Sequence, residues 1–308
     1  MKLCRYIEDG RPASGVVVNS RVVSFGAMES AAGDGIPADL DDVIQTGALP
    51  RVREAVLRFG DELARRSRPV DAVQLVAPLL RPPKIWCIGL NYREHASALD
   101  ERSPDEPASF MRPAASIRGP GDHICLPPDA ERVTGEAELA VVIGRRCKFV
   151  SPGEAYDCIA GFLPAIDMTA EDVLRRNPRF LTRSKSFDTF LSLGPWIVTP
   201  DEIGDRDAVR RVRVSTVLNG RPERTNTGEN MTHDVFALIA FHSRVMTWEP
   251  GDILLTGTPG AVVIRDGDVI GCDIDGIGRL ENPVALLPTT GVPLPGRLDT
   301  LAHAGRDL

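Results

Sequence analysis

The sequence is poor in lysine, in aromatic residues and in long uncharged runs. Only four of its 36 basic residues are lysines, and Phe, Trp and Tyr make up 5% of its 308 residues. Nowhere do about 18 residues pass without a charge or a turn former, and the first residues include no apolar signal segment, so we expect a soluble, cytoplasmic protein without membrane contact. The net charge of -7 argues against the basic surface of a nucleic-acid binder.

The spacing of the cysteines also excludes some kinds of site. The six cysteines lie at positions 4, 87, 125, 147, 158 and 272, and none is part of a C-x-x-C motif. Several fall in apolar runs, so we expect buried reduced thiols rather than a disulfide framework. A chain of 308 residues can form one large domain with a smaller appendage.

Patterns along the chain predict an α+β fold made mostly of strands. Residues 1–26 have the alternation and turn residues of a small sheet, and residues 39–67 have the spacing of a helical region. Pro78 and Arg81-Pro82-Pro83 then break the pattern. The predicted units are a small N-terminal α/β domain (1–78), a β-rich catalytic domain (79–287) and a C-terminal tail (288–308).

Turn residues and apolar spacing predict several elements of the β-rich domain. Residues 212–218 followed by Asn219-Gly220 predict a hairpin, and residues 268–275 and 280–287 predict a closing strand pair. Thr232 is predicted to cap a helix. The apolar stripe of that helix includes His242, which we interpret as a core residue rather than a ligand.

Three carboxylates are the clearest indication of chemistry. Glu136 and Glu138 open an apolar run, and the two-residue period of a strand would point both side chains to one face. Asp167 ends a second apolar run, 161–166, and pairing of the two strands could bring it beside the first two. Three clustered carboxylates repel one another unless they bind a cation, and oxygen-only ligands suit Mg²⁺, Mn²⁺ or Ca²⁺.

A structural explanation exists for each of these residues. Glu136 and Glu138 could form a solvated strand edge, which is the commoner meaning of Glu-x-Glu taken alone. Lys185 could belong to an ordinary buried ion pair, and His95 could be a loop histidine at a domain junction. Lys185 nevertheless favours a functional site. The chain uses arginine for most of its basic residues, so composition alone does not explain a lysine, with its compact ammonium group, at this position.

Eight short segments between residues 84 and 284 resemble the fumarylacetoacetate hydrolase family, and they occur in the family's order. They are Gly89-Leu90-Asn91-Tyr92-x-x-His95, residues 135–144, Asp167-Met168-Thr169-Ala170, Lys185-Ser186-Phe187-Asp188, Gly194-Pro195-Trp196, Pro250-Gly251-Asp252, Thr256-Gly257-Thr258-Pro259 and Gly276-Ile277-Gly278. Each segment is weak alone. The resemblance implies a mixed β-roll catalytic domain that is usually homodimeric.

The resemblance also implies roles for particular residues. The implied ligands of magnesium or manganese are Glu136, Glu138 and Asp167, and calcium could take the same place in a crystal. The implied catalytic residues are His95, as a proton acceptor, and Lys185, as a cation that stabilises developing negative charge. The implied substrate-binding residues are Gly257, Thr258, Tyr92 and Arg112.

The implied activity is metal-dependent hydrolysis of a carbon–carbon bond in an acylpyruvate-like or other diketo acid, through a metal-chelated enolate. Two departures leave other reactions open. Ala98 stands where many hydrolytic members have Glu, for which Asp100 or Glu101 could substitute. Glu171 and Leu174 stand where the family often has Arg and Gln that hold the substrate, so we do not expect fumarylacetoacetate itself as the substrate.

Two alternative functions therefore remain beside hydrolysis. One is decarboxylation, isomerisation or dehydration of a 2-oxo acid on the same metal site, which the missing glutamate motivates. The other is a metal-binding dimer that has lost catalysis. The presence of both His95 and Lys185 argues against the second.

Overall fold

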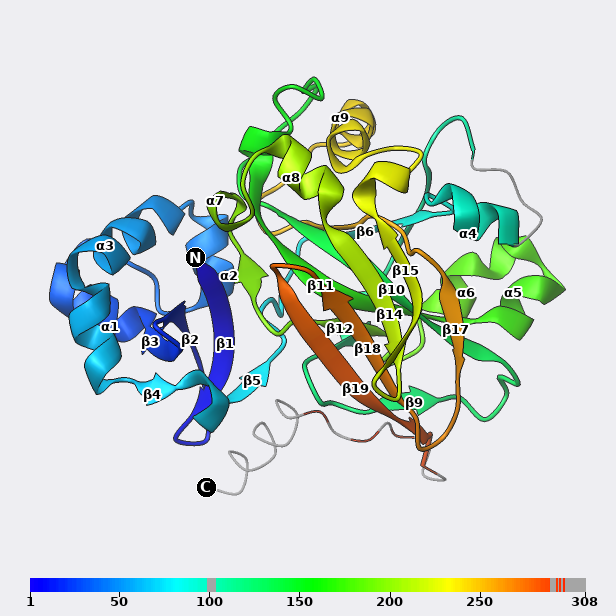
Figure 1. Cartoon of the computed structure of the whole chain (residues 1–308), viewed down its shortest axis with the longest axis horizontal. Coiled ribbons are helices and arrows are strands. Elements are labelled where there is room, and N and C mark those ends of the chain that lie inside the picture. Colours follow the sequence, from blue (N-terminus) through cyan, green and yellow to red (C-terminus); the bar gives the residue numbers. More distant parts are fainter. Residues whose placement is uncertain (99–103, 289–291, 293, 295, 297–308) are drawn as a thin grey trace.

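The computed structural model describes residues 1–98, 104–288, 292, 294 and 296. Strands take up 37% of the chain and helices 29%, which confirms the prediction of a mixed fold made mostly of strands. Figure 1 shows an N-terminal layer beside two larger β layers, with short helices at the ends of the strands. The predicted tail, 288–308, lies largely outside the described residues.

The N-terminal layer combines short strands with three helices. Its strands are β1 (Lys2–Glu8), β2 (Arg11–Val18), β3 (Arg21–Ser24), β4 (Arg68–Pro69) and β5 (Gln74–Val76). Its helices are α1 (Phe25–Ala32), α2 (Leu40–Gln45) and α3 (Leu49–Arg66). The predicted helical region 39–67 is thus two helices, because Gly47 turns with a φ of +69° and α3 then begins at Leu49, with Pro50 in its first turn.

This layer is continuous with the rest of the molecule. Strand β1 pairs with β2 on one side and with β13 (Ile197–Val198) on the other, with Leu3 opposite Ile197. One buried cluster contains Leu3 and Phe25 together with Leu163 and Leu255 of the central strands. The predicted boundary near residue 78 therefore marks a change of composition without a gap in the packing.

The larger sheet runs β4-β3-β2-β1-β13-β11-β10-β16-β6-β7. Its remaining strands are β6 (Ile85–Gly89), β7 (Ala108–Met111), β8 (Ile117–Arg118), β10 (Val133–Ile143), β11 (Ile159–Ala170), β12 (Leu191–Leu193), β16 (Ile253–Leu255) and β17 (Ala261–Ile264). The long antiparallel pair β10–β11 lies at its centre and is buried along its whole length. The site described below is on this pair.

The smaller sheet runs β15-β14-β18-β19-β9 and packs across β10 and β11. Its strands are β9 (Ile124–Leu126), β14 (Arg213–Leu218), β15 (Arg221–Thr227), β18 (Val269–Ile274) and β19 (Gly278–Leu286). Strands β14 and β15 form the predicted hairpin, in which Asn219 and Gly220 have φ values of +50° and +78°. Strands β18 and β19 form the predicted closing pair.

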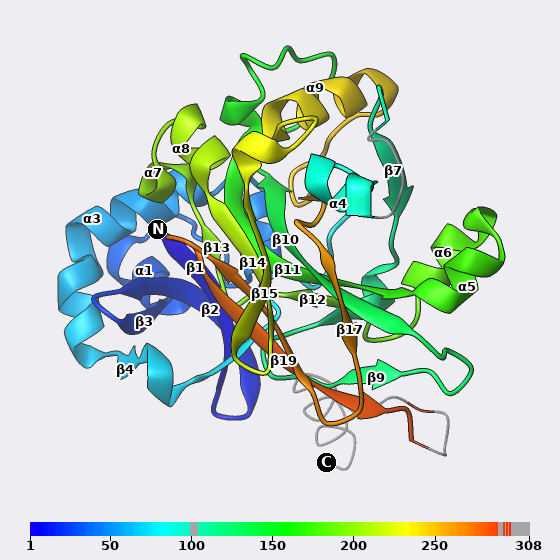
Figure 2. The same ribbon diagram turned by 45° about the vertical axis from the view of Figure 1, so that its right-hand side comes forward.

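Short helices connect the strands of the two sheets. They are α4 (Arg93–Ala98), α5 (Glu171–Arg176), α6 (Leu181–Lys185), α7 (Pro200–Ile203), α8 (Arg206–Arg211) and α9 (Val235–Val245). Single 3₁₀ turns occur at Val70–Ala72, Ala114–Ser116, Tyr156–Cys158, Pro178–Phe180 and Gly228–Asn230. In Figure 2, α4 and α9 lie at one end of the strands, whereas α5 and α6 project to the side.

The predicted cap of α9 is wrong, whereas the core role of His242 is confirmed. Asp234 caps the helix, because its carboxylate accepts a hydrogen bond from the Ala237 amide at 2.8 Å. His242 is 1% exposed, its Nδ1 lies 2.9 Å from the carbonyl oxygen of Leu238, and its ring contacts Trp86. It is a buried histidine with a backbone partner.

Two further sequence expectations have structural counterparts. All six cysteines are buried free thiols, as predicted. Within the described residues, no helix is both long enough and apolar enough to cross a membrane.

Candidate metal centre and active site

Strand pairing brings the three predicted carboxylates together. Glu136 of β10 is directly opposite Asp167 of β11, and Glu138 follows Glu136 by two residues, so all three side chains point to the same face. The alternate residues of β10, such as Ala137 and Leu139, pack into the core shared with the smaller sheet. Because side chains alternate along a strand, one face of β10 packs into the apolar core and the other face carries the carboxylates.

The three carboxylates form a compact buried cluster. One oxygen atom from each of Glu136, Glu138 and Asp167 lies within 4.8 Å of those of the other two. Their exposed fractions are 9%, 2% and 0%, so the alternative of a solvated strand edge is wrong. Burial, and next the charge of Asp167, raises the pKa of Glu138 well above its usual value.

Two buried cations face the cluster from different elements. Lys185, at the end of α6, donates a hydrogen bond to Glu136 Oε2 at 2.9 Å, and its Nζ lies 3.1 Å from Asp167 Oδ2. Burial lowers the pKa of Lys185, but the charges of Asp167 and Glu136 outweigh this effect and raise the pKa above its usual value. Lys185 therefore stays protonated.

Arg112 holds Asp167 from the other side. Its Nη2 donates to Asp167 Oδ1 and, at 2.6 Å, to the Met168 carbonyl, and its Nη1 donates to the Phe190 carbonyl at 2.8 Å. With no exposed side-chain surface, Arg112 orients Asp167. Its predicted contact with substrate stays a prediction.

The residues of this cluster fit a divalent cation. Asp167 Oδ2 is buried and accepts no hydrogen bond, although the Lys185 ammonium lies 3.1 Å away, so this oxygen still has lone pairs to offer to a cation. Three ionised carboxylates facing two cations leave an excess negative charge, and burial, followed by the charge of Asp167, raises the pKa of Glu138. An oxygen-only set suits magnesium or manganese. A divalent cation would be held by Glu136, Glu138 and Asp167.

Removing the ammonium of Lys185 is expected to destabilise the metal-free protein. In Lys185→Met, Glu136 and Asp167 lose their shared cation in a buried place, so the free energy of unfolding should fall by about 3 kcal/mol. Urea unfolding in the presence of a chelator measures this. The control is Lys148→Met, which changes an exposed lysine. Equal stabilities of the two variants would contradict the assignment of Lys185.

The segment Thr256–Gly260 forms one wall of the site. The Gly257 amide donates to Glu138 Oε2 at 2.7 Å, and Gly257 has a φ of +95°, with Asn91 Cβ only 2.9 Å from where a Cβ would lie. A side chain at 257 would therefore displace this amide. The hydroxyl of Thr258 exchanges hydrogen bonds with the backbone of Gly260.

Asn91 joins this wall to the start of α9. Its Nδ2 donates to the Thr256 carbonyl at 2.8 Å and to the His233 carbonyl at 2.9 Å, while its Oδ1 accepts from the His233 amide. We did not predict this role, although Asn91 lies within one of the segments that carry the family resemblance.

Tyr92 and His95 lie on the segment that leads into and forms α4. Tyr92 is fully buried, its hydroxyl has no hydrogen-bond partner among the described residues, and the charge of Glu138 acts on it. Burial lowers the pKa of His95, as do the charges of Lys185 and Arg224, whereas Glu136 and Glu171 oppose the shift. The lowered pKa keeps the imidazole of His95 neutral at neutral pH, and the charges of Glu136 and Lys185 act on it.

Within the described residues, no carboxylate is hydrogen-bonded to His95. Residue 98 is alanine, and the two predicted substitutes, Asp100 and Glu101, lie outside the described residues. Glu171 is near enough for its charge to act on His95, but its carboxylate accepts hydrogen bonds from Arg132 and Arg175. Among the residues that the structure describes, His95 thus has no carboxylate partner of the kind that the resemblance implies for a hydrolase.

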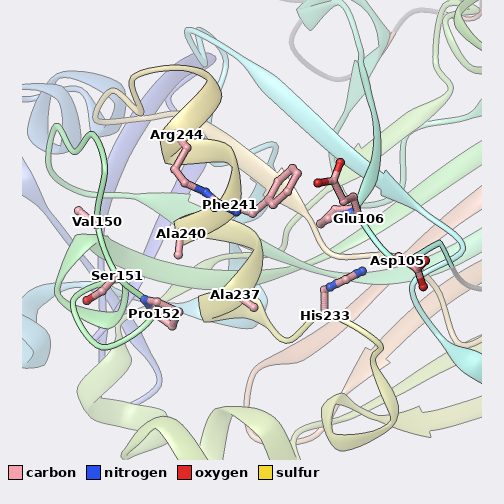
Figure 3. A pocket seen from close by; sticks show the side chains of 11 residues that line it. Asp105, Glu106, Val150, Ser151, Pro152, His233, Ala237, Ala240, Phe241 and Arg244 are labelled. Atoms are coloured by element: carbon pink, nitrogen blue, oxygen red, sulfur yellow. The ribbon is translucent and has the colours of Figure 1, made fainter.

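A separate hollow beside α9 is a poorer candidate for chemistry. It has a volume of about 590 Å³, and Figure 3 shows His233 and Glu106 on one side of it and Ser151 on the other. None of the three clustered carboxylates lines it, and neither His95 nor Lys185 does. We therefore place the site at the carboxylates, where buried charge is concentrated.

Comparisons with known proteins show similarity in sequence and in fold. Residues 84–285 match the family described as "Fumarylacetoacetate (FAA) hydrolase C-terminal". The mitochondrial oxaloacetate tautomerase of Rattus norvegicus is 35% identical over 293 residues, which cover 86% of this chain and 92% of that protein.

Two solved structures extend the similarity to most of the chain. One is 5-carboxymethyl-2-hydroxymuconate delta-isomerase from Mycobacterium smegmatis, which is 32% identical with a TM-score of 0.72 over 94% of this chain and all of that chain. The other is maleylpyruvate hydrolase from Sphingobium sp. SYK-6 in complex with manganese(II) and pyruvate. It is 28% identical with a TM-score of 0.76 over 93% of this chain and 99% of that chain.

Proposed function

Because this chain belongs to the fumarylacetoacetate hydrolase family, we propose that it is a divalent-metal-dependent tautomerase that interconverts the keto and enol forms of a 2-oxo acid. One observation carries the choice of reaction. His95 is a neutral imidazole on which the charges of Glu136 and Lys185 act, and no carboxylate among the described residues is hydrogen-bonded to it.

The chemical demands of the two main candidate reactions differ. Tautomerisation moves one proton between carbon and oxygen, so a single neutral imidazole is a sufficient base. Hydrolysis of a carbon–carbon bond needs in addition a water molecule that is positioned and deprotonated, which a carboxylate behind the histidine would assist. The lone His95 therefore favours tautomerisation over the hydrolysis that the resemblance alone implies.

In the proposed reaction each residue has a distinct task. When bound, a divalent cation supplies Lewis-acid polarisation of the 2-oxo group. His95 takes the proton from the carbon next to that group and delivers it to the 2-oxo oxygen, which gives the enol; the reverse transfer restores the keto form. Lys185 keeps its proton and faces the negative charge that develops, while the Gly257 amide and the Arg112 guanidinium hold Glu138 and Asp167 in place.

A side-by-side assay of three substrates tests this proposal. Oxaloacetate, an acylpyruvate and a 2-keto-3-deoxy sugar acid are each supplied with Mg²⁺ or Mn²⁺ and then with a chelator. We expect metal-dependent loss of the enol absorbance of oxaloacetate without release of new acids. No metal-dependent turnover of any substrate, with metal still bound, would instead support the non-catalytic dimer.

Carbon–carbon hydrolysis is the second candidate. It is supported by the similarity to maleylpyruvate hydrolase over 93% of the chain. Release of two acids from the acylpyruvate at a rate comparable with enol conversion would favour it.

The rate is expected to fall only in acid. His95 acts as a base in its neutral form, and its pKa is lowered from 6.5, so kcat/KM should be level near neutral pH and fall below an inflection that lies under pH 6.5. A bound divalent cation adds positive charge and moves the inflection further down. Rate measurements from pH 4.5 to about 8 would show this. An inflection above pH 6.5 would contradict it.

A further inference from the structure

Arg224 is the guanidinium that the smaller sheet brings to the edge of the site. It lies on β15 directly opposite Thr216 of β14. The hydroxyl of Thr216 donates to the Gly260 carbonyl at 3.0 Å and accepts from the Ala137 amide at 3.1 Å. Ala137 lies between Glu136 and Glu138, so hydrogen bonds connect the position of Arg224 to the strand that holds the carboxylates.

The direction of the Arg224 side chain follows from its neighbour two residues along. Side chains two apart on a strand share a face. Asn226 uses that face to donate from Nδ2 to Glu94 Oε2 at 3.1 Å, and Glu94 precedes His95 in α4. Arg224 therefore lies on the same face as Asn226, toward α4, and its charge acts on His95.

A glycine fixes the path of the arginine stem. A Cβ at Gly260 would lie 2.8 Å from both Cγ and Cδ of Arg224, so only the absence of a side chain at 260 lets the stem rest on the loop. The stem of the exposed Arg224 thus rests on the Gly260 end of the Thr256–Gly260 wall, and the charge of its guanidinium acts on His95 of α4.

No acidic side chain among the described residues forms an ion pair with Arg224. Its one hydrogen bond among the described residues runs from Nη1 to the carbonyl of Glu223 at 2.9 Å, and none of the recorded ion pairs there includes it. Glu171, the nearby acid, is already held by Arg132 at 2.5 Å and Arg175 at 3.1 Å. A guanidinium without a carboxylate partner at the edge of a site can bind one from a ligand.

We propose that Arg224 binds a second carboxylate of the substrate and so selects dicarboxylic 2-oxo acids, whose other end occupies the carboxylate cluster through a bound cation. The inference rests on the proposed function, because it names the substrate class of the same site. It also explains how the chain can hold such a substrate although Glu171 stands where the family often has arginine.

The test compares oxaloacetate with pyruvate, which differ by one carboxylate. In Mg²⁺-loaded protein, Arg224→Ala should weaken the binding of oxaloacetate about 10- to 100-fold in calorimetry and raise its KM to a similar extent, since a charged hydrogen bond is lost. Binding of pyruvate, and its rate of hydrogen–deuterium exchange at C3, should change less than about 3-fold. Arg221→Ala, at an exposed position of the same strand, is the control.

A second variant acts on Arg224 without removing it. Gly260→Ala places a methyl group against the arginine stem and should shift the guanidinium, so it should weaken oxaloacetate binding more than pyruvate binding. Gly260 does not have a positive φ, so alanine imposes no backbone strain there. Arg224→Lys should restore part of the affinity, because it keeps the charge and loses the planar fork.

The outcomes separate this inference from the proposed function. Equal losses for oxaloacetate and pyruvate, or no loss for either, would overturn the assignment of Arg224 even if the wild-type protein is an active tautomerase. A selective loss of oxaloacetate binding in a protein that converts neither ligand would uphold Arg224 and overturn the proposed reaction.

Discussion

Replacing Glu138 with alanine is expected to abolish both divalent-metal binding and turnover. Glu138 is 2% exposed and is one of three carboxylates whose oxygen atoms lie within 4.8 Å of one another, so its loss removes a third of the ligand set. A metal ion contributes several kcal/mol to transition-state stabilisation, which corresponds to a fall in kcat of roughly 10³-fold or more.

Calorimetry and thermal unfolding measure the effect on metal binding without relying on activity. Mg²⁺ at about 100 times its Kd should stabilise the wild-type protein by about 2.7 kcal/mol and should leave Glu138→Ala unchanged. The metal-free variant should still fold, because burial already raises the pKa of Glu138 and disfavours its charge. Full metal occupancy and a normal rate in this variant would refute the metal centre.

Two further variants distinguish the effect of the charge of Glu138 from the effect of its shape. Glu138→Gln keeps an oxygen that can accept from the Gly257 amide and should also lose metal affinity. Glu281→Ala removes an exposed glutamate that pairs with Arg279 on the same strand, and it should bind metal normally.

His95→Gln is expected to lower kcat by about 10²- to 10⁴-fold, the usual contribution of a general base, while metal affinity stays unchanged. His95 is not a member of the carboxylate cluster, so its removal should affect proton transfer and leave the ligand set complete. The acidic fall of kcat/KM should disappear with it.

The matched control is His123→Gln, a histidine outside the site. If both histidine variants keep the wild-type rate, another group moves the proton. If His95→Gln loses metal as well as activity, the imidazole contributes to the metal site.

The carboxylate cluster was predictable because it depends on the order of residues within two short segments. Strand alternation places Glu136 and Glu138 on one face, and a second apolar run ending in Asp167 is the natural partner of a neighbouring strand. The hairpin at Asn219-Gly220 was predictable for the same reason, since its turn needs positive φ. Both predictions use information contained within a few residues.

The parts that were missed depend on contacts between distant segments. The pairing of β1 with β13 joins residues almost 200 positions apart, and no local pattern near residue 78 reveals it. The task of Arg112 follows from its position against Asp167, and that of Arg224 from the crossing of β15 over Gly260. The resemblance implied substrate binding for Arg112 but gave no sign of its contact with Asp167, and Arg224 looks like an ordinary cation in the sequence. The cap of α9 failed because two cap-forming residues, Thr232 and Asp234, stand close together and only packing selects one.

The complete burial of β10 and β11 has a practical consequence for redesign. Because every residue of these two strands is buried, most substitutions there disturb packing on one face, so randomising both strands would mostly yield proteins that fail to fold. In the proposed arrangement, helix α4, strand β15 and the Gly260 turn surround the substrate at the rim of the site. A mutant library aimed at new substrates should therefore vary the rim and leave the two central strands untouched.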